Sequence, residues 1–126
     1  MKIALLGSNK GKFNLVFSED VMNKLKQYGE VSPELINKGS LERHKDFLSE
    51  CEVAFSTWGM LKLSEEEIKK YLPKLKIIFY AAGTVQYFAK PFLNCGVRVF
   101  SAFAANAVPV AEYTVSQIIL ASKGFY

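Results

Sequence analysis

The sequence contains few of the residues on which many enzymes depend. Only two cysteines, Cys51 and Cys95, and one histidine, His44, occur among its 126 residues. The cysteines are far apart and form no Cys-x-x-Cys pair, which argues against a zinc or redox site and favours small buried thiols. A single histidine without a partner acid or nucleophile argues against a hydrolase triad. We therefore expect no metal site in this chain.

Long apolar runs and concentrated positive charge are also missing. No run approaches the ~18 apolar residues of a membrane helix, so we expect no membrane partner. The opening "MKIALLG" lacks a cleavage-site pattern, which predicts a strand rather than a signal peptide and a cytoplasmic protein. The net charge is +4, but the 16 lysines and arginines are dispersed beside acidic residues. A nucleic-acid surface needs a basic stripe, so we expect no nucleic-acid partner.

The chain does contain a regular alternation of short apolar runs and amphipathic segments. Five runs predict strands: 2–7, 30–36, 52–57, 75–83 and 97–102. Pro33 interrupts the second run, which places that strand at a sheet edge. The run at 75–83 is almost continuously apolar, as in a parallel strand covered on both faces. The order predicts an α/β fold, with an open parallel sheet of about five strands in a flavodoxin-like three-layer sandwich.

Capping signals locate the helices between these strands. Ser18 caps one helix that Gly29 ends. Ser64 and Glu67 form a capping box for another. Weaker patterns predict two more helices, at 40–51 and 89–94. A last helix begins with Asn106 as its cap and is apolar on nearly every side, which predicts that several neighbours cover it.

In such a sheet, ligands bind beyond the carboxyl ends of the strands. The loop "GSNKGKF" has neither P-loop nor Gly-x-Gly-x-x-Gly spacing, and it is not the hydroxyl-rich loop that a flavin phosphate needs. In "STWGM", Trp58 offers an aromatic wall and Gly59 allows close backbone approach. In "AAGTVQYF", Ala82 and Gly83 leave backbone N–H groups free to hold an anion. Both loops are equally compatible with tight turns that bind nothing.

The closing part of the chain is similar to a known family. The small loop "AAGTV", the strand "GVRVFSA" and the helix opening "NAVPVAEYT" together resemble the D-isomer-specific 2-hydroxyacid dehydrogenases. The resemblance runs from about residue 56 to 124. In that family, a flavodoxin-like domain contacts the substrate and a Rossmann domain binds the nicotinamide cofactor. The resemblance implies a substrate-side domain at 1–105 and, at 106–126, a helix leading to a Rossmann domain that this chain lacks.

The resemblance also implies a substrate site. Its residues would be Trp58, Gly59, Ala82, Gly83 and Asn106. The N–H groups of Ala82 and Gly83 would hold the carboxylate of a small 2-hydroxy or 2-oxo acid. No catalytic residue of the family falls within this chain. Many relatives have an acid where Val85 stands and glycine where Ala81 stands, which leaves the substrate and the turn geometry open.

These implications predict a truncated, NAD- or NADP-dependent oxidoreductase acting on the CH–OH group of a 2-hydroxy acid. We expect NAD or NADP to bind the complete protein and no cofactor to bind this chain, which should not turn over 2-oxo acids with NADH. The homodimer of the family is not expected without the cofactor domain. The outer face of the last helix should be exposed, or it should lie in a contact that forms only in this truncated chain. The alternative is a non-catalytic carboxylate-binding or regulatory module of the same fold.

Overall fold

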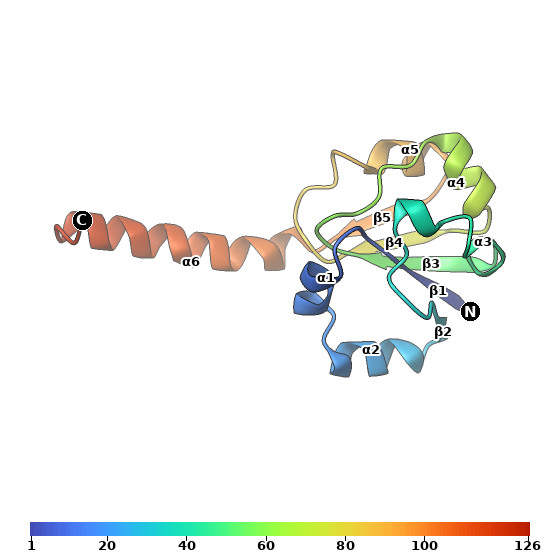
Figure 1. Cartoon of the computed structure of the whole chain (residues 1–126). Coiled ribbons are helices and arrows are strands. Elements are labelled where there is room, and N and C mark those ends of the chain that lie inside the picture. The colour runs from blue at the N-terminus through green and yellow to red at the C-terminus, as the bar shows by residue number, and fades with distance from the viewer.

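A computed structural model describes residues 1–126 and shows a five-stranded, all-parallel sheet (Figure 1). The strands are β1 (Lys2–Leu6), β2 (Glu30–Val31), β3 (Cys51–Ser56), β4 (Ile77–Tyr80) and β5 (Arg98–Ser101). They lie in the order β2-β1-β3-β4-β5. This order is that of a flavodoxin-like fold, and it confirms the predicted fold class. The strand predicted over 30–36 is at one edge as expected, but it is shortened to the two residues of β2, which end before Pro33.

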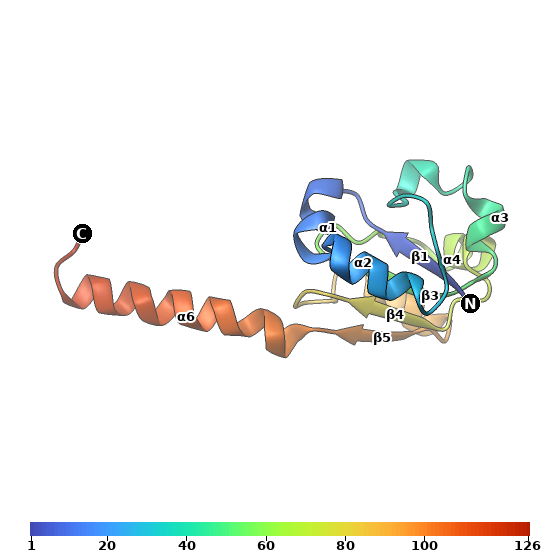
Figure 2. The same cartoon turned by 90° about the horizontal axis from the view of Figure 1, so that it is seen from below.

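Six α-helices accompany the sheet. They are α1 (Lys10–Val16), α2 (Glu19–Lys26), α3 (Lys45–Leu48), α4 (Glu65–Tyr71), α5 (Ala89–Asn94) and α6 (Phe103–Ser122), with a 3-10 turn at Lys38–Ser40. Helices α3, α4 and α5 cover one face of the sheet, while α1 and α2 lie on the other (Figures 1 and 2). Helix α6 extends away from the sheet as a separate arm. None of the helices combines the length and hydropathy that crossing a membrane requires.

Local capping explains where two helices begin. Ser18 accepts a hydrogen bond from the Val21 N–H at the start of α2. At the start of α4, Ser64 accepts from the Glu67 N–H and the Glu67 carboxylate accepts from the Ser64 N–H, at 3.2 and 2.8 Å. The capping box predicted from the sequence is therefore confirmed, and it satisfies two N–H groups that the helix would otherwise leave unpaired.

The predicted start of the last helix is wrong. Helix α6 begins at Phe103, Ala102 occupies the cap position, and no side chain caps it. The small helix-favouring residues Ala104 and Ala105 extend the helix backward, and the Asn106 N–H already donates to the Ala102 carbonyl. Asn106 thus lies inside the first turns of α6, so the boundary drawn between residues 105 and 106 cuts a continuous helix.

Two further local predictions need correction. The helix predicted over 40–51 is reduced to the single turn of α3, and Cys51 opens β3 instead of closing a helix. Helix α1 was not predicted, because Gly11 within it made the segment look like a turn; Asn9 caps it by accepting from the Lys12 N–H at 2.9 Å.

Both cysteines are free thiols, and burial raises the pKa of Cys51 to about 12.

The two faces of the sheet are covered unequally. Twenty buried residues form the core under α3, α4 and α5, whereas the buried apolar residues on the other face are Ile3, Leu5, Phe13 and Phe17. Phe79 and Phe100 are 39% and 49% exposed there. The prediction that the central strand is covered on both faces is therefore wrong for this chain. Helices α1 and α2 pack over β1 and its neighbours and leave the β4–β5 side open.

A charge cluster beside the main core gives the fold a predictable acid sensitivity. The pKa of Glu34 is held below its ordinary value of 4.5, mainly by a hydrogen bond to His44 and also by the nearby Arg43. A carboxyl group whose pKa falls on folding stabilises the fold above about pH 4.5, and this contribution is lost as the pH drops through the folded-state pKa. The effect is small because Glu34 is exposed.

We expect the Glu34→Gln variant to melt slightly below the parent at neutral pH and to approach it in acid. Thermal melts followed by circular dichroism between pH 7 and 3 measure this convergence. Glu112→Gln is the control, since Glu112 lies on α6 and forms no ion pair. A difference between Glu34→Gln and the parent that stays constant with pH would contradict the expectation.

Candidate functional site

The loops after β1, β3 and β4 are joined at the carboxyl edge of the sheet. The Ser8 N–H donates to the Gly59 carbonyl at 2.9 Å, and the Ala81 N–H donates to the Ser56 carbonyl at 2.8 Å. The Ser56 hydroxyl in turn donates to the Leu6 carbonyl at 2.6 Å. These bonds fix the three loops relative to one another, so the edge is a preorganised surface.

Gly59 is required by the close approach of two of these loops. Its φ of 91° lies in the region that favours glycine. A Cβ atom at this position would lie 2.6 Å from the Ser8 Oγ. Trp58, the preceding residue, is exposed at the same edge, but no hydrogen bond joins it to Ala82 or Gly83.

The turn at Ala82 and Gly83 has its carbonyl groups paired and its N–H groups unpaired. The Ser101 hydroxyl donates to the carbonyls of Ala82 and Gly83. The Thr57 hydroxyl donates to the Ala81 carbonyl at 3.1 Å. The N–H groups of Ala82 and Gly83 donate to no other group of the chain. Ala82 is 1% exposed and Gly83 is partly exposed. Adjacent N–H groups without an internal acceptor are the donors that anion-binding turns use.

Asn106 lies directly beside this turn. Its Nδ2 atom would be 3.1 Å from a Cβ atom placed on Gly83. The side-chain amide therefore reaches back from the second turn of α6 and adds a third N–H donor next to the unpaired backbone groups. The structure thus brings together Gly83 and Asn106, two of the residues singled out from the sequence, although Asn106 is not the helix cap.

Aromatic packing anchors the far end of the same loop. Phe88 is buried against Tyr80 and Tyr87, with ring centroids 5.0 Å apart in both pairs. The Tyr80 and Tyr87 hydroxyls are 3.2 Å apart, and burial is the main cause that raises the pKa of Tyr80. The Lys62 ammonium lies 5.8 Å from the Tyr87 ring centroid, which brings positive charge close to the loop that follows β4.

Sequence reasoning missed Ser8 and Ser101, the two serines that position the site. Their shared signal is a hydroxyl residue at or just beyond the carboxyl end of a strand, β1 for Ser8 and β5 for Ser101. A hydroxyl residue at such a position identifies a site only when the strand order is known. Ser101 lies at the end of β5, and its hydroxyl reaches the loop that follows the neighbouring strand β4.

The residues of this chain do not fit a nicotinamide cofactor. The turn after β1 lacks the glycine pattern that receives a pyrophosphate, and the Asn9 side chain there is engaged in capping α1. Glu34, the acid after β2, lies 2.7 Å from the His44 Nε2 and is paired with Arg43, so it is not free for a ribose. No group of three His, Cys, Asp or Glu side chains could hold a metal ion.

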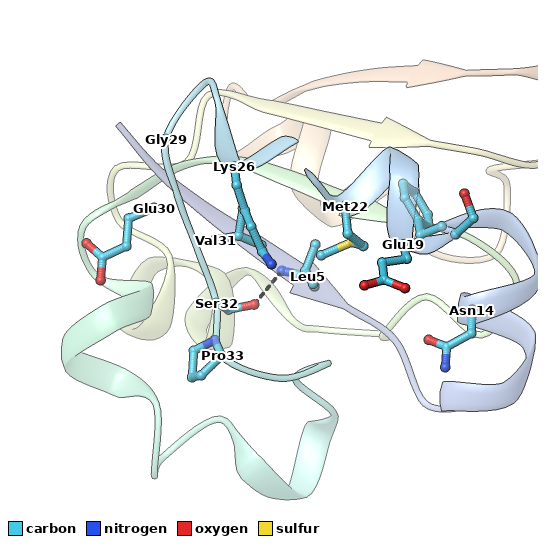
Figure 3. A pocket seen from close by; sticks show the side chains of 12 residues that line it. Leu5, Asn14, Glu19, Met22, Lys26, Gly29, Glu30, Val31, Ser32 and Pro33 are labelled. Atoms are coloured by element: carbon cyan, nitrogen blue, oxygen red, sulfur yellow. Dashed lines mark hydrogen bonds between the residues drawn. The ribbon is translucent and has the colours of Figure 1, made fainter. Parts of the chain in front are cut away.

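The largest hollow in the molecule, about 770 Å³, lies elsewhere, between α2 and strands β1 and β2 (Figure 3). Its floor includes Leu5 and Met22, and Lys26 lies at its rim. The buried Ser32 hydroxyl accepts from the Leu5 N–H and donates to the Glu34 carbonyl, so it offers no unpaired group. Helix α2 has no buried residue. The hollow therefore reflects loose packing of α2.

Comparisons with known proteins place this fold. No protein-family model and no curated protein sequence matches the chain. It superposes on an NAD-dependent formate dehydrogenase from Staphylococcus aureus, solved in complex with NAD, with a TM-score of 0.64 and 24% identity over 95% of this chain. A putative D-3-phosphoglycerate dehydrogenase from Ralstonia solanacearum gives a TM-score of 0.54 and 19% identity over 79%.

The chain spans only about a third of either dehydrogenase, 36% of the first and 29% of the second. Both are members of the family that the closing sequence resembles, so the resemblance is confirmed in the fold. At these identities the similarity concerns the fold alone. The chain therefore has a flavodoxin-like fold that also occurs within two D-2-hydroxyacid-type dehydrogenases.

Proposed function

We propose that this chain forms the substrate-carboxylate side of an NAD- or NADP-dependent dehydrogenase acting on the CH–OH group of a small 2-hydroxy acid. The observation that carries the proposal is the Ala82–Gly83 turn, whose N–H groups are unpaired while Ser101 holds its carbonyls. The fold, shared with two dehydrogenases, supports the same function.

The chemistry of the turn suits a carboxylate. A carboxylate carries only acceptors, and hydrogen bonds from N–H groups to an ionised acceptor are stronger than those to a neutral one. Ala82 and Gly83 would donate to its oxygens, with the Asn106 amide beside them. Gly59 and the exposed Trp58 would line the remaining side. These residues bind and orient the acid.

Proton and hydride transfer would fall to other residues. His44 is engaged by Glu34, and no residue described above is suited to receive the proton of the substrate hydroxyl. A cofactor domain would supply the nicotinamide and the acid–base residue, and it is the partner that this proposal requires. A cytoplasmic location forms part of the same proposal, consistent with two free thiols.

A non-catalytic carboxylate-binding or regulatory module is the second candidate. It is favoured by the poor fit of this chain to a dinucleotide. Both candidates predict the same anion site, so binding alone does not separate them. Reading the coding DNA beyond Tyr126 does: a Gly-x-Gly-x-x-Gly segment within a few tens of codons supports the enzyme, and a stop codon supports the module.

Calorimetric titration tests the carboxylate site. We expect D-lactate to bind with a millimolar Kd and lactamide, which lacks the charge, to bind about tenfold more weakly. Gly83→Ala should weaken D-lactate binding several-fold, because its Cβ would press on the Asn106 amide. Thr84→Ala, at the exposed next residue, is the matched control. Equal affinity for D-lactate and lactamide would contradict the proposal.

A further inference from the structure

Three successive carbonyl groups after β4 are each held by a side-chain hydroxyl. The Thr57 hydroxyl donates to the Ala81 carbonyl at 3.1 Å, and Thr57 is 1% exposed. The Ser101 hydroxyl, which is half-buried, lies within hydrogen-bond distance of the Ala82 and Gly83 carbonyls. Thr57 directly follows β3 and Ser101 ends β5, the two strands on either side of β4. Side chains from both neighbouring strands therefore fix the direction of these carbonyls.

The planarity of the peptide group converts these carbonyl directions into N–H directions. In a trans peptide, the N–H group points opposite to the carbonyl of the residue before it, and this chain has no cis peptide. The carbonyls of Ala82 and Gly83 both face the Ser101 hydroxyl. The N–H groups of Gly83 and Thr84 consequently both point away from Ser101, to the same side of the turn. The Ala82 N–H belongs to the preceding peptide group, which Thr57 holds, so its direction is set separately.

The Thr84 N–H is free to bind a ligand. Thr84 lies outside the helices and strands, and its N–H donates to no other group of the chain. Thr84 is exposed and Gly83 is partly exposed, so this part of the turn is open to solvent. On its other side, the Val85 carbonyl accepts from the N–H groups of Phe88 and Ala89 at 3.2 and 2.9 Å. Thr84 is thus held between the turn that Ser101 fixes and the start of α5.

We propose that the Thr84 N–H is a further donor of the carboxylate site, acting beside the Gly83 N–H on the same anion. This inference rests on the proposed function and adds a residue to its site. Two N–H groups on one side of a turn can each donate to one oxygen of a carboxylate, and such charge-assisted bonds are the stronger kind. The Asn106 amide lies next to Gly83, and the loop 81–88 contains no acidic residue that would repel the anion.

The donor is a backbone group, and the Thr84 side chain takes no part. An amino-acid pattern therefore does not reveal it, because every residue except proline carries an N–H group. Its role depends instead on the Ser101 hydroxyl, which reaches the turn from the neighbouring strand.

Amide NMR of the ¹⁵N-labelled chain, titrated with D-lactate, tests the role of Thr84 without any substitution. We expect the Thr84 amide to shift and to saturate with the same Kd as the Gly83 amide. The Gln86 amide is the internal control, because Gln86 is exposed in the same loop and its N–H also donates to no group of the chain. If Gly83 and Asn106 saturate while Thr84 does not move, the proposed function stands and this inference is overturned. If no amide saturates, the carboxylate site fails and this inference fails with it.

Thr84→Pro removes the donor and provides a second test. We expect it to weaken D-lactate binding about tenfold, as measured by the same titration. Gln86→Pro is the matched control, since it also removes an unpaired N–H from the loop. Gln86 is the second residue of the turn that the Phe88 N–H closes on the Val85 carbonyl, a position that proline favours. Melts followed by circular dichroism establish that both variants are folded. Equal Kd values for the two folded variants would overturn the inference, and if Thr84→Pro does not fold, the titration of the parent decides.

Discussion

Replacing Phe88 by alanine is expected to lower the free energy of unfolding by about 3–5 kcal/mol. The ring is 2% exposed and packs against Tyr80, Tyr87 and Phe92. Removing it leaves a cavity at the point where the candidate site's loop joins α5. Because small domains are stable by only about 5–15 kcal/mol, this single change removes a large fraction of the total.

Urea unfolding followed by circular dichroism measures the Phe88→Ala effect. Leu93→Ala is the matched control, because Leu93 lies on α5, the helix that Phe88 precedes, with its side chain more than half exposed. We expect that control to cost less than about 1 kcal/mol. If both variants lost the same stability, Phe88 would not be the anchor of the loop.

The substitution Gly59→Ala is expected to cost about 2–3 kcal/mol, through two separable effects. The positive φ disfavours any Cβ, and the added atom would also lie 2.6 Å from the Ser8 Oγ. Gly96→Ala isolates the first effect, since Gly96 has a φ of 80° and open space around it. We expect Gly96→Ala to cost about 1 kcal/mol.

The double variant Ser8→Ala/Gly59→Ala isolates the second effect. Removing the Ser8 hydroxyl should reduce the cost of Gly59→Ala to about that of Gly96→Ala, as measured by a double-mutant cycle in urea. If Gly59→Ala costs no more than Gly96→Ala in the parent background, the close approach of the β1 and β3 loops is not a constraint. The carboxyl edge would then be less rigid than described.

Much of this fold is encoded in local signals and could be predicted from the sequence. Helix α5 occupies residues 89–94, as its apolar spacing predicted, and the Ser64 capping box forms as expected. The edge position of the strand before Pro33 is as predicted, although β2 ends at Val31. In each case, the deciding interaction lies within a few residues of the chain, so the amino-acid pattern is sufficient.

Features that depend on distant contacts could not be predicted in the same way. The exposure of Phe79 follows from where α1 and α2 pack, which apolar periodicity alone does not encode. The role of Ser101 depends on its register with β4. The position of Asn106 beside Gly83 was implied only by family resemblance, while its local pattern indicated a cap.

The central claim is that the unpaired N–H groups of Ala82 and Gly83 bind a carboxylate. Titration of the ¹⁵N-labelled chain with D-lactate, followed by amide NMR, tests it most directly. We predict that the Ala82 and Gly83 amides and the Asn106 side-chain amide shift together and saturate with one Kd, and that lactamide leaves them nearly unchanged. The absence of saturating shifts at these three groups, or shifts centred on Lys10 and Lys12, would contradict the account.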